Sequence, residues 1–249
     1  ALKETLEAVK DVFEKNRYAG IACAIKNSGV GVGLPDIGRC RLKAEDGKVH
    51  IYAGATCIGQ GLATVLVQIV TETAGIPAEQ IVYHFPNTET CPDSGTTSGS
   101  RQTTITGEAA KRAAEKLRDS MAGKTISDLN GEEFSGEYSA ETDKINTTAE
   151  NPVFHVAYGY MTQVCVLNED GTIQKIVSAV DCGKAVNPVM AEGQIEGGAI
   201  MSMGYCLTED YRLEHCRPSV KFGTLGLLRA DQVPPVESIL VEKEGTDMA

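Results

Sequence analysis

Two pairs of alternating segments, each closed by a short polar turn, constrain the fold of this chain more than any other feature. Apolar and polar side chains alternate in residues 39–44 and again in 49–53, and the Asp-Gly dipeptide between them is typical of a hairpin turn. Residues 160–167 and 173–180 repeat this arrangement around a four-residue polar turn. Because alternation at a period of two is the pattern of a half-buried strand, we predict two antiparallel hairpins.

Helical patterns separate these hairpins. Apolar residues recur at helical spacing in three segments, 2–15, 61–74 and 101–121. Gly75 and Pro77 mark the end of the second helix. A fourth helix is predicted for the Gly-rich segment 189–204, where each glycine costs about 1 kcal/mol relative to alanine and so indicates that something packs closely against the helix. The predicted fold class is α+β, with antiparallel hairpins and sheets covered by helices.

Two further strands are predicted outside the hairpins. Residues 21–33 are apolar, and Gly29, Gly31 and Gly33 alternate at the end of the segment. This pattern favours a strand that lies close to another backbone or to a ligand. A short strand is also expected at residues 81–85.

The domain organisation follows from one polar stretch. A length of 249 residues allows one large domain or two smaller ones. Residues 123–150 are polar and poor in apolar side chains, which favours a linker or surface excursion between a first lobe, 1–122, and a second lobe, 151–249. The chain begins with Ala1 rather than methionine, and no closing element is visible at its end. We therefore expect part of a longer subunit, with the second lobe incomplete at its C-terminus.

Composition excludes some classes of partner. The chain has 23 Lys and Arg against 34 Asp and Glu, a net charge of −11, without a basic cluster, which disfavours nucleic acid. No apolar run approaches the roughly 18 residues that a membrane span needs, and no signal peptide is visible. We expect a cytoplasmic protein without a membrane or nucleic-acid partner.

The eight cysteines do not form a metal-binding pattern. No two of them lie within five residues of each other, which excludes C-x-x-C zinc sites and clustered iron–sulfur spacings. Several lie in apolar strand patterns, so we predict buried free thiols in a reducing compartment. The four histidines show no ligand spacing either, and no metal-ligating residue is predicted.

A glutamine between two glycines precedes the predicted helix 61–74. The glycines of Gly59-Gln60-Gly61 allow a ligand to approach the backbone, and free N–H groups at a helix start favour an anion. The Gln60 amide offers a donor and an acceptor without a charge. The alternative is a tight turn before a helix, and both interpretations stay open.

A second polar segment, 94–102, precedes the predicted helix 101–121. It combines several hydroxyls and two glycines with Arg101 and Gln102, which suits a phosphate at a helix N-terminus. A flexible loop with an N-cap is the alternative. The segment is neither a Walker loop nor a G-x-G-x-x-G motif.

Three motifs follow one another in a characteristic order. They are Ile58–Gly61, Thr97–Gln102, and Val180–Pro188 with Gln194–Gly197. This series resembles the molybdenum-binding subunit of the xanthine dehydrogenase and aldehyde oxidase family, in its C-terminal part. The resemblance covers residues 20–240 and is weakest in 123–150. It implies two related lobes of a molybdopterin-binding domain.

The resemblance also implies a cofactor and the residues that hold it. The cofactor is molybdopterin with molybdenum, and the resemblance admits the cytosine dinucleotide form. By motif, Gln60, flanked by Gly59 and Gly61, matches a glutamine beside the oxo ligand of the metal, and Gln194 matches one that hydrogen-bonds the pterin. The loop that holds the pterin and its phosphates corresponds to Thr97, Ser98, Gly99, Ser100, Arg101 and Gln102. A dithiolene of the pterin holds the metal, so the resemblance requires no protein ligand.

The implied activity is that of an oxidoreductase. In the family, a metal-bound hydroxide attacks an electron-poor carbon of a heterocycle or aldehyde, and a glutamate acts as the base. Electrons leave through iron–sulfur clusters and FAD on other domains or subunits.

The sequence departs from the family pattern in two places. The Gly-x-Gly-Glu-Pro-like segment that carries the catalytic glutamate is absent, so the base is expected beyond Ala249, and an upstream Arg/Gly-rich segment is absent too. We expect the chain to be a truncated or split subunit that is inactive alone. Two alternatives remain at this point: a non-enzymatic binding module, and a phosphate- or nucleotide-binding enzyme that uses the 94–102 loop.

Overall fold

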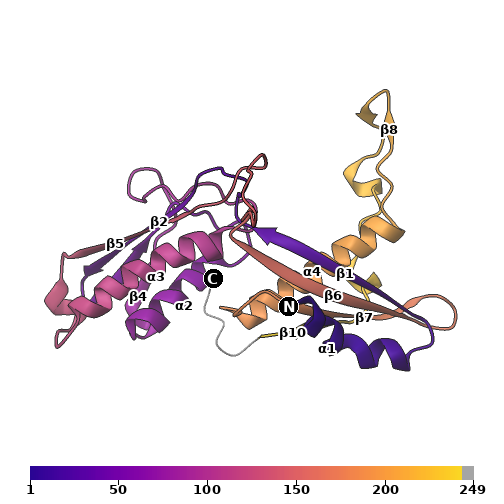
Figure 1. Ribbon diagram of the computed structural model, residues 1–249, viewed down its shortest axis with the longest axis horizontal. Coiled ribbons are helices and arrows are strands. Elements are labelled where there is room, and N and C mark those ends of the chain that lie inside the picture. The colour runs from indigo at the N-terminus through magenta and orange to yellow at the C-terminus, as the bar shows by residue number, and fades with distance from the viewer. Residues whose placement is uncertain (243–249) are drawn as a thin grey trace. The chain divides into compact units, whose positions relative to one another are not determined.

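The chain forms two compact units in the computed structural model, which describes residues 1–242 (Figure 1). We call them the terminal unit, made of Ala1–Ile25 and the described residues from Gly159 onward, and the central unit, Lys26–Tyr158. The predicted division into lobes 1–122 and 151–249 differs from this one, because the N-terminal helix belongs to the same unit as the C-terminal strands. Residues 243–249 of the predicted second lobe lie outside the described residues.

The terminal unit is built on a four-stranded sheet with the order β1-β6-β7-β10. Strands β6 and β7 form an antiparallel hairpin, whereas β10 pairs with β7 in parallel. Its elements are α1 (Leu2–Lys15), β1 (Ala19–Ser28), β6 (Ala157–Leu167), β7 (Ile173–Asp181), α4 (Pro188–Leu207) and β10 (Val236–Leu240).

Helix α1 covers this sheet with its apolar side. Val9 is fully buried and belongs to one apolar cluster with valines of β6 and β7, among them Val164 and Val177. A buried hydrogen bond of 2.7 Å between the hydroxyls of Thr5 and Thr162 also joins α1 to β6. The helix is therefore fixed by its apolar spacing, as the sequence predicts.

The central unit has a second four-stranded sheet, with the order β4-β3-β2-β5. Strand β2 pairs in antiparallel fashion with β3 and with β5, and β4 pairs with β3 in parallel. Its elements are β2 (Asp36–Glu45), β3 (Lys48–Tyr52), α2 (Leu62–Ala74), β4 (Ile81–Tyr83), α3 (Gln102–Ser120) and β5 (Glu133–Ala140).

Glycines in β2 and β5 let α3 lie directly on the sheet (Figure 1). A Cβ atom on Gly38 would lie 2.6 Å from the carbonyl oxygen of Ile105, and one on Gly136 would lie 1.9 Å from that of Ala109. Fully buried side chains such as Leu42 in the sheet and Leu66 in α2 fill the core of this unit. The close approach fixes the position at which α3 begins, and with it the loop before α3.

The remaining elements are short. They are η1 (Ala78–Gln80), η2 (Ile126–Leu129), β8 (Leu213–Glu214), β9 (Arg217–Pro218), η3 (Phe222–Thr224) and η4 (Ala230–Gln232). Across residues 1–242, no helix has the length and apolarity that crossing a membrane requires.

The structure confirms the α+β class, the four helices and both hairpins, but two predictions were wrong. Residues 133–140 of the predicted linker are strand β5, and every residue of β5 pairs with β2. The apolar pattern is hidden because one inward position is a glycine, Gly136. The predicted strand 21–33 ends at Ser28, and Gly29, Gly31 and Gly33 follow in a turn with positive φ angles. The close backbone approach predicted there is present, since a Cβ on Gly31 would lie 2.4 Å from the carbonyl oxygen of Phe154.

All eight cysteines are free thiols, but most of them are not buried. Only Cys40 is fully enclosed. The four exposed ones are Cys23, Cys182, Cys206 and Cys216. Burial was therefore predicted wrongly for these four. Cys23 and Cys206 lie in the largely exposed elements β1 and α4, and Cys182 and Cys216 lie outside the helices and strands.

Candidate functional site

The segment that precedes α3 is held by side-chain hydrogen bonds from Arg101 and Gln102. Arg101 is almost completely buried, with 2% of its side chain exposed. Its Nε donates to Asp36, its Nη1 to the carbonyl oxygens of Ser94 (2.6 Å) and Thr96 (2.9 Å), and its Nη2 to that of Ile37 (2.8 Å). Four of the five N–H groups of the guanidinium predicted to contact the cofactor thus bind groups inside the protein.

Gln102 is also engaged. Its side-chain nitrogen donates to the carbonyl oxygen of Thr96 at 3.0 Å, and its oxygen accepts from the hydroxyl of Thr106. The side chain is buried. Of the predicted loop residues, Arg101 and Gln102 therefore face inward, whereas Ser98 and Ser100 are exposed.

The backbone of the same segment is rich in available donors. Within residues 1–242, no acceptor takes the backbone N–H of any residue from Thr96 to Ser100. These groups lie at the N-terminus of the 19-residue helix α3, where the helix dipole favours an anion. This arrangement suits phosphate oxygens.

Gln60 lies beside this loop. Its flanking residues Gly59 and Gly61 have φ angles of 106° and 80°, which only glycine adopts readily. The half-buried Gln60 side chain accepts from the N–H of Ile58 at 2.6 Å and donates to the carbonyl oxygen of Thr56 at 3.4 Å. The hydroxyl of Thr97 donates to the same oxygen at 2.8 Å. Two motifs about 40 residues apart in sequence are thus joined at Thr56.

Cys57 adds a thiol to this corner, and sequence reasoning assigned it no role. Backbone N–H groups at the start of α2, chiefly that of Gly59, lower the pKa of Cys57 below its usual value. Its position immediately before a Gly-rich helix start was the available signal.

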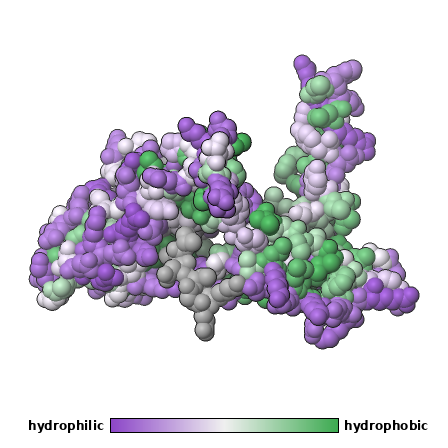
Figure 2. Space-filling model, in the orientation of Figure 1, coloured by the Kyte–Doolittle hydropathy of each residue, from purple (hydrophilic) through white to green (hydrophobic). Residues whose placement is uncertain are grey.

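Gln194 belongs to the other unit of the chain. It lies in α4 of the terminal unit, where its side chain is exposed. Its neighbours Gly193, Gly197 and Gly198 have open space around them, with no described atom within 4 Å of an added Cβ. The close packing predicted for this helix is absent from the described residues at these three positions. In Figure 2, hydrophobic residues gather on the visible face over α4 and nearby strands of this unit, in keeping with the high exposure of Val189, Met201 and Tyr205.

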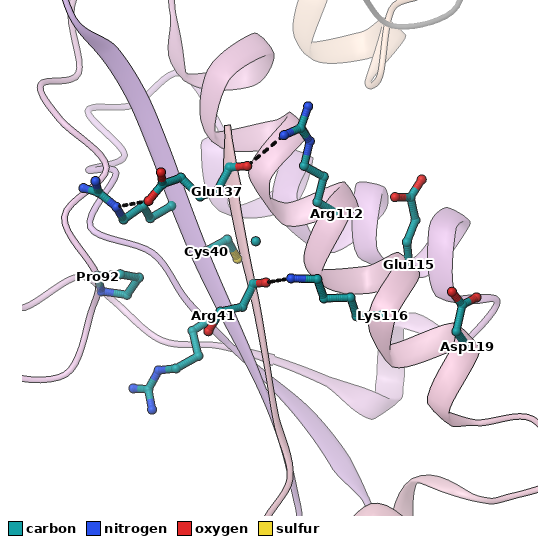
Figure 3. Close-up of a pocket in the computed structure, with 11 residues that line it drawn as sticks. Cys40, Arg41, Pro92, Arg112, Glu115, Lys116, Asp119 and Glu137 are labelled. Atoms are coloured by element: carbon teal, nitrogen blue, oxygen red, sulfur yellow. Dashed lines mark hydrogen bonds and ion pairs between the residues drawn. The ribbon is translucent and has the colours of Figure 1, made fainter. Parts of the chain in front are cut away.

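The central unit has a hollow of about 590 Å³ away from these motifs (Figure 3). It lies at the edge strand β5, where Arg112 donates to the carbonyl oxygen of Glu137 and Lys116 to that of Ser135. Its charged lining is mixed, and it contains none of the predicted cofactor residues. Charged side chains commonly protect the edge of a sheet, and we assign this structural role to the charged residues that line the hollow.

No metal site is present in the described residues. Residues 1–242 contain no group of three or more His, Cys, Asp and Glu side chains that could hold a metal ion. Two histidines that are far apart in sequence are in contact: Nδ1 of His50 lies 2.8 Å from Nε2 of His84.

Comparison with known proteins defines the class. The chain belongs to the molybdopterin cofactor-binding domain family, whose model matches residues 2–133 and 121–234. It is 29% identical over 260 residues to the putative xanthine dehydrogenase molybdenum-binding subunit of Escherichia coli, covering 84% of this chain and 34% of that protein. It is 26% identical to the aldehyde oxidoreductase of Megalodesulfovibrio gigas, covering 83% of this chain and 25% of the relative. The chain thus spans about a third or less of these relatives.

A solved structure has the same fold. The aldehyde oxidoreductase from Desulfovibrio gigas superposes with a TM-score of 0.75 at 22% identity, covering 97% of this chain and 29% of the other. The resemblance stated from the three motifs is therefore confirmed at the level of family and fold.

Proposed function

We propose that this chain is the cofactor-binding portion of a molybdenum hydroxylase, an oxidoreductase that hydroxylates an electron-poor carbon of a heterocycle or aldehyde with water. Membership of the molybdopterin cofactor-binding family supports the cofactor. Relatives named for xanthine, a heterocycle, and for aldehydes support the substrate class. The family match favours this function over a nucleotide-binding enzyme or a non-enzymatic module.

One observation carries the proposal: the N–H groups of Thr96–Ser100, which have no acceptor among the described residues, lie beside the glutamine turn at Gln60. Neutral donors of this kind fit a cofactor that combines phosphate oxygens with pterin heteroatoms. The chain has a net charge of −11, so the wider field repels an anion and local donors must hold it.

Each predicted residue has a role in this proposal. The loop Thr97–Ser100 holds phosphate and pterin oxygens through its N–H groups and the hydroxyls of Ser98 and Ser100. The Gln60 amide turns from its weak 3.4 Å contact with Thr56 towards the cofactor, and Gln194 supplies a further amide from α4. When bound, the cofactor supplies the two-electron oxidation and the oxygen transfer.

Other parts of the enzyme complete the reaction. We propose that the catalytic glutamate lies beyond Ala249, because this chain lacks the segment that would carry it. Iron–sulfur and FAD-containing domains or subunits accept the electrons, in keeping with a relative named as a subunit. The cytosine dinucleotide form of the cofactor and a cytoplasmic location belong to the same proposal.

The test uses the natural complex, purified after growth with molybdate. We expect stoichiometric molybdenum by mass spectrometry and pterin fluorescence after oxidative release. Gln60→Ala should lower turnover at least about tenfold, the effect of losing one hydrogen bond of about 1.4 kcal/mol in the reacting complex. The matched control is Gln80→Ala, an exposed glutamine in η1 of the same unit. A wild-type complex without molybdenum and pterin would refute the proposed function.

A further inference from the structure

Burying the ion pair of Asp36 and Arg101 costs desolvation free energy that apolar side chains in the same place would not cost. Their side chains are 1% and 2% exposed, and Arg101 ranks first by volume among the fully buried side chains of the described residues. Burying an ion pair commonly stabilises a protein no more than well-packed apolar residues would. Stability alone therefore gives a weak reason for this pair, and its directional hydrogen bonds give a better one.

Arg101 donates hydrogen bonds to carbonyl oxygens of the loop that precedes it. Its Nη1 binds the oxygens of Ser94 and Thr96, and the N–H of Gly29 binds the oxygen of Gly99 at 3.0 Å. Three carbonyls of the 94–101 segment therefore point inward, toward the body of the central unit.

A planar trans peptide directs its C=O and the following N–H in opposite directions. Since the carbonyl of Thr96 points inward, the N–H of Thr97 points outward, and the same holds for Gly99 and Ser100. Neither N–H has an acceptor among residues 1–242. The buried guanidinium thus determines which face of the loop offers donors.

Asp36 makes this arrangement possible in two ways. One carboxylate oxygen accepts from Nε of Arg101 and neutralises its charge, and the other accepts from the N–H of Val30 at 2.7 Å. Val30 belongs to the glycine turn whose Gly29 binds Gly99. One carboxylate therefore fixes both the cation and the turn that hold the loop.

We propose that Asp36 and Arg101 are positioning residues that never touch the cofactor: the buried pair turns the loop carbonyls inward, so that the N–H groups of Thr97 and Ser100 bind an anionic oxygen of a cofactor phosphate. This inference rests on the proposed function, and it assigns Arg101 a role different from direct phosphate contact.

The test separates orientation of the loop from stability of the fold. Three variants of the natural complex are compared: Arg101→Met, the double variant Asp36→Asn with Arg101→Met, and Leu42→Ala. The double variant removes both charges and so avoids a lone buried carboxylate. Leu42 is fully buried in β2, away from the loop, and its truncation lowers the unfolding midpoint without touching the donors. Molybdenum and pterin content are measured on folded complex well below each midpoint.

We expect the double variant to recover most of the unfolding midpoint that Arg101→Met loses, and yet to hold about tenfold less cofactor than wild type at limiting supply, the equivalent of one phosphate hydrogen bond. Leu42→Ala should stay fully loaded. If the double variant recovers too little stability, its loading is compared with that of Leu42→Ala at an equal distance below the midpoint.

Two results would decide against the inference. Wild-type loading in a folded double variant would overturn it, as would an equal loss of cofactor in Leu42→Ala, which would show that loading follows stability alone. A wild-type complex without any molybdenum or pterin is a different failure, because it refutes the proposed function itself.

Discussion

The loop before α3 and the helix α4 were both predicted to hold the cofactor, yet they are built in opposite ways. In the loop, Arg101 and Gln102 are buried and hydrogen-bond to backbone carbonyl oxygens of the central unit. In α4, Gln194 is exposed and Gly197 has open space around it within the described residues. The first segment is fixed before any ligand arrives, whereas in the second no described atom packs against Gly193, Gly197 or Gly198.

This difference shows that matching a motif does not give a residue its physical role. Arg101 occupies a motif position expected to contact the cofactor, yet its guanidinium binds carbonyl oxygens of its own loop. Backbone N–H groups, which no sequence motif displays, are the donors of that loop that have no acceptor among the described residues. Preorganised donors cost little to reorganise on binding, so the loop is the stronger half of the proposed site.

The largest expected effect on stability comes from comparing a buried arginine of the central unit with an exposed arginine of the terminal unit. Arg101→Met leaves Asp36 as an unpaired buried carboxylate, and we expect it to destabilise the chain by about 3–5 kcal/mol. Arg212→Met in the terminal unit breaks an exposed pair with Asp210, and we expect a change of about 0–1 kcal/mol. Denaturant unfolding of the chain measures both. Equal effects would remove the distinction between the two regions.

A second prediction concerns a glycine under α3. In Gly136→Ala the new methyl group would collide with the carbonyl oxygen of Ala109, so α3 must move away from β5. We expect a loss of about 2–3 kcal/mol, the upper part of the range for overpacked cores, read as a lower unfolding midpoint. An unchanged midpoint would show that α3 does not depend on this contact.

Local periodicity predicted most of the fold, because the four helices and both hairpins follow from patterns within single segments. It missed β5, whose inward position Gly136 contributes no apolar side chain to the pattern. It could not find the pairing of Asp36 with Arg101, since 65 residues separate them and only the folded sheet brings them together. It also could not tell an inward arginine from an outward one, because both have the same motif.

A third comparison uses two cysteines, each beside a predicted cofactor segment. Helix N–H groups lower the pKa of Cys57, whereas desolvation of the thiol, followed by the charge of Asp181, raises the pKa of Cys182 even though the residue as a whole is exposed. The thiolate is the reactive form, so at pH 7–8 iodoacetamide should alkylate Cys57 several times faster, although the residue Cys182 is the more exposed. Raising the pH should increase the rate at Cys57 first and at Cys182 later.

Peptide mass spectrometry assigns the two rates. Cys57→Ser should remove the fast reaction, while Cys40, with a pKa raised to about 12 by burial, should remain unmodified throughout. Faster alkylation of Cys182 than of Cys57 would mean that exposure, and not the helix start, controls reactivity here.

The smallest expected effect on stability tests whether the glycines of α4 have open space around them. Gly197→Ala adds a methyl group where no described atom lies within 4 Å, and alanine restricts the unfolded chain more than glycine does. We expect the chain to gain about 0.5–1 kcal/mol, with Gly193→Ala as the matched second site. A loss in the chain alone would contradict the open environment. A gain in the chain that becomes a loss in the natural complex would instead show that a partner surface packs on these glycines, as their number in one helix first indicated.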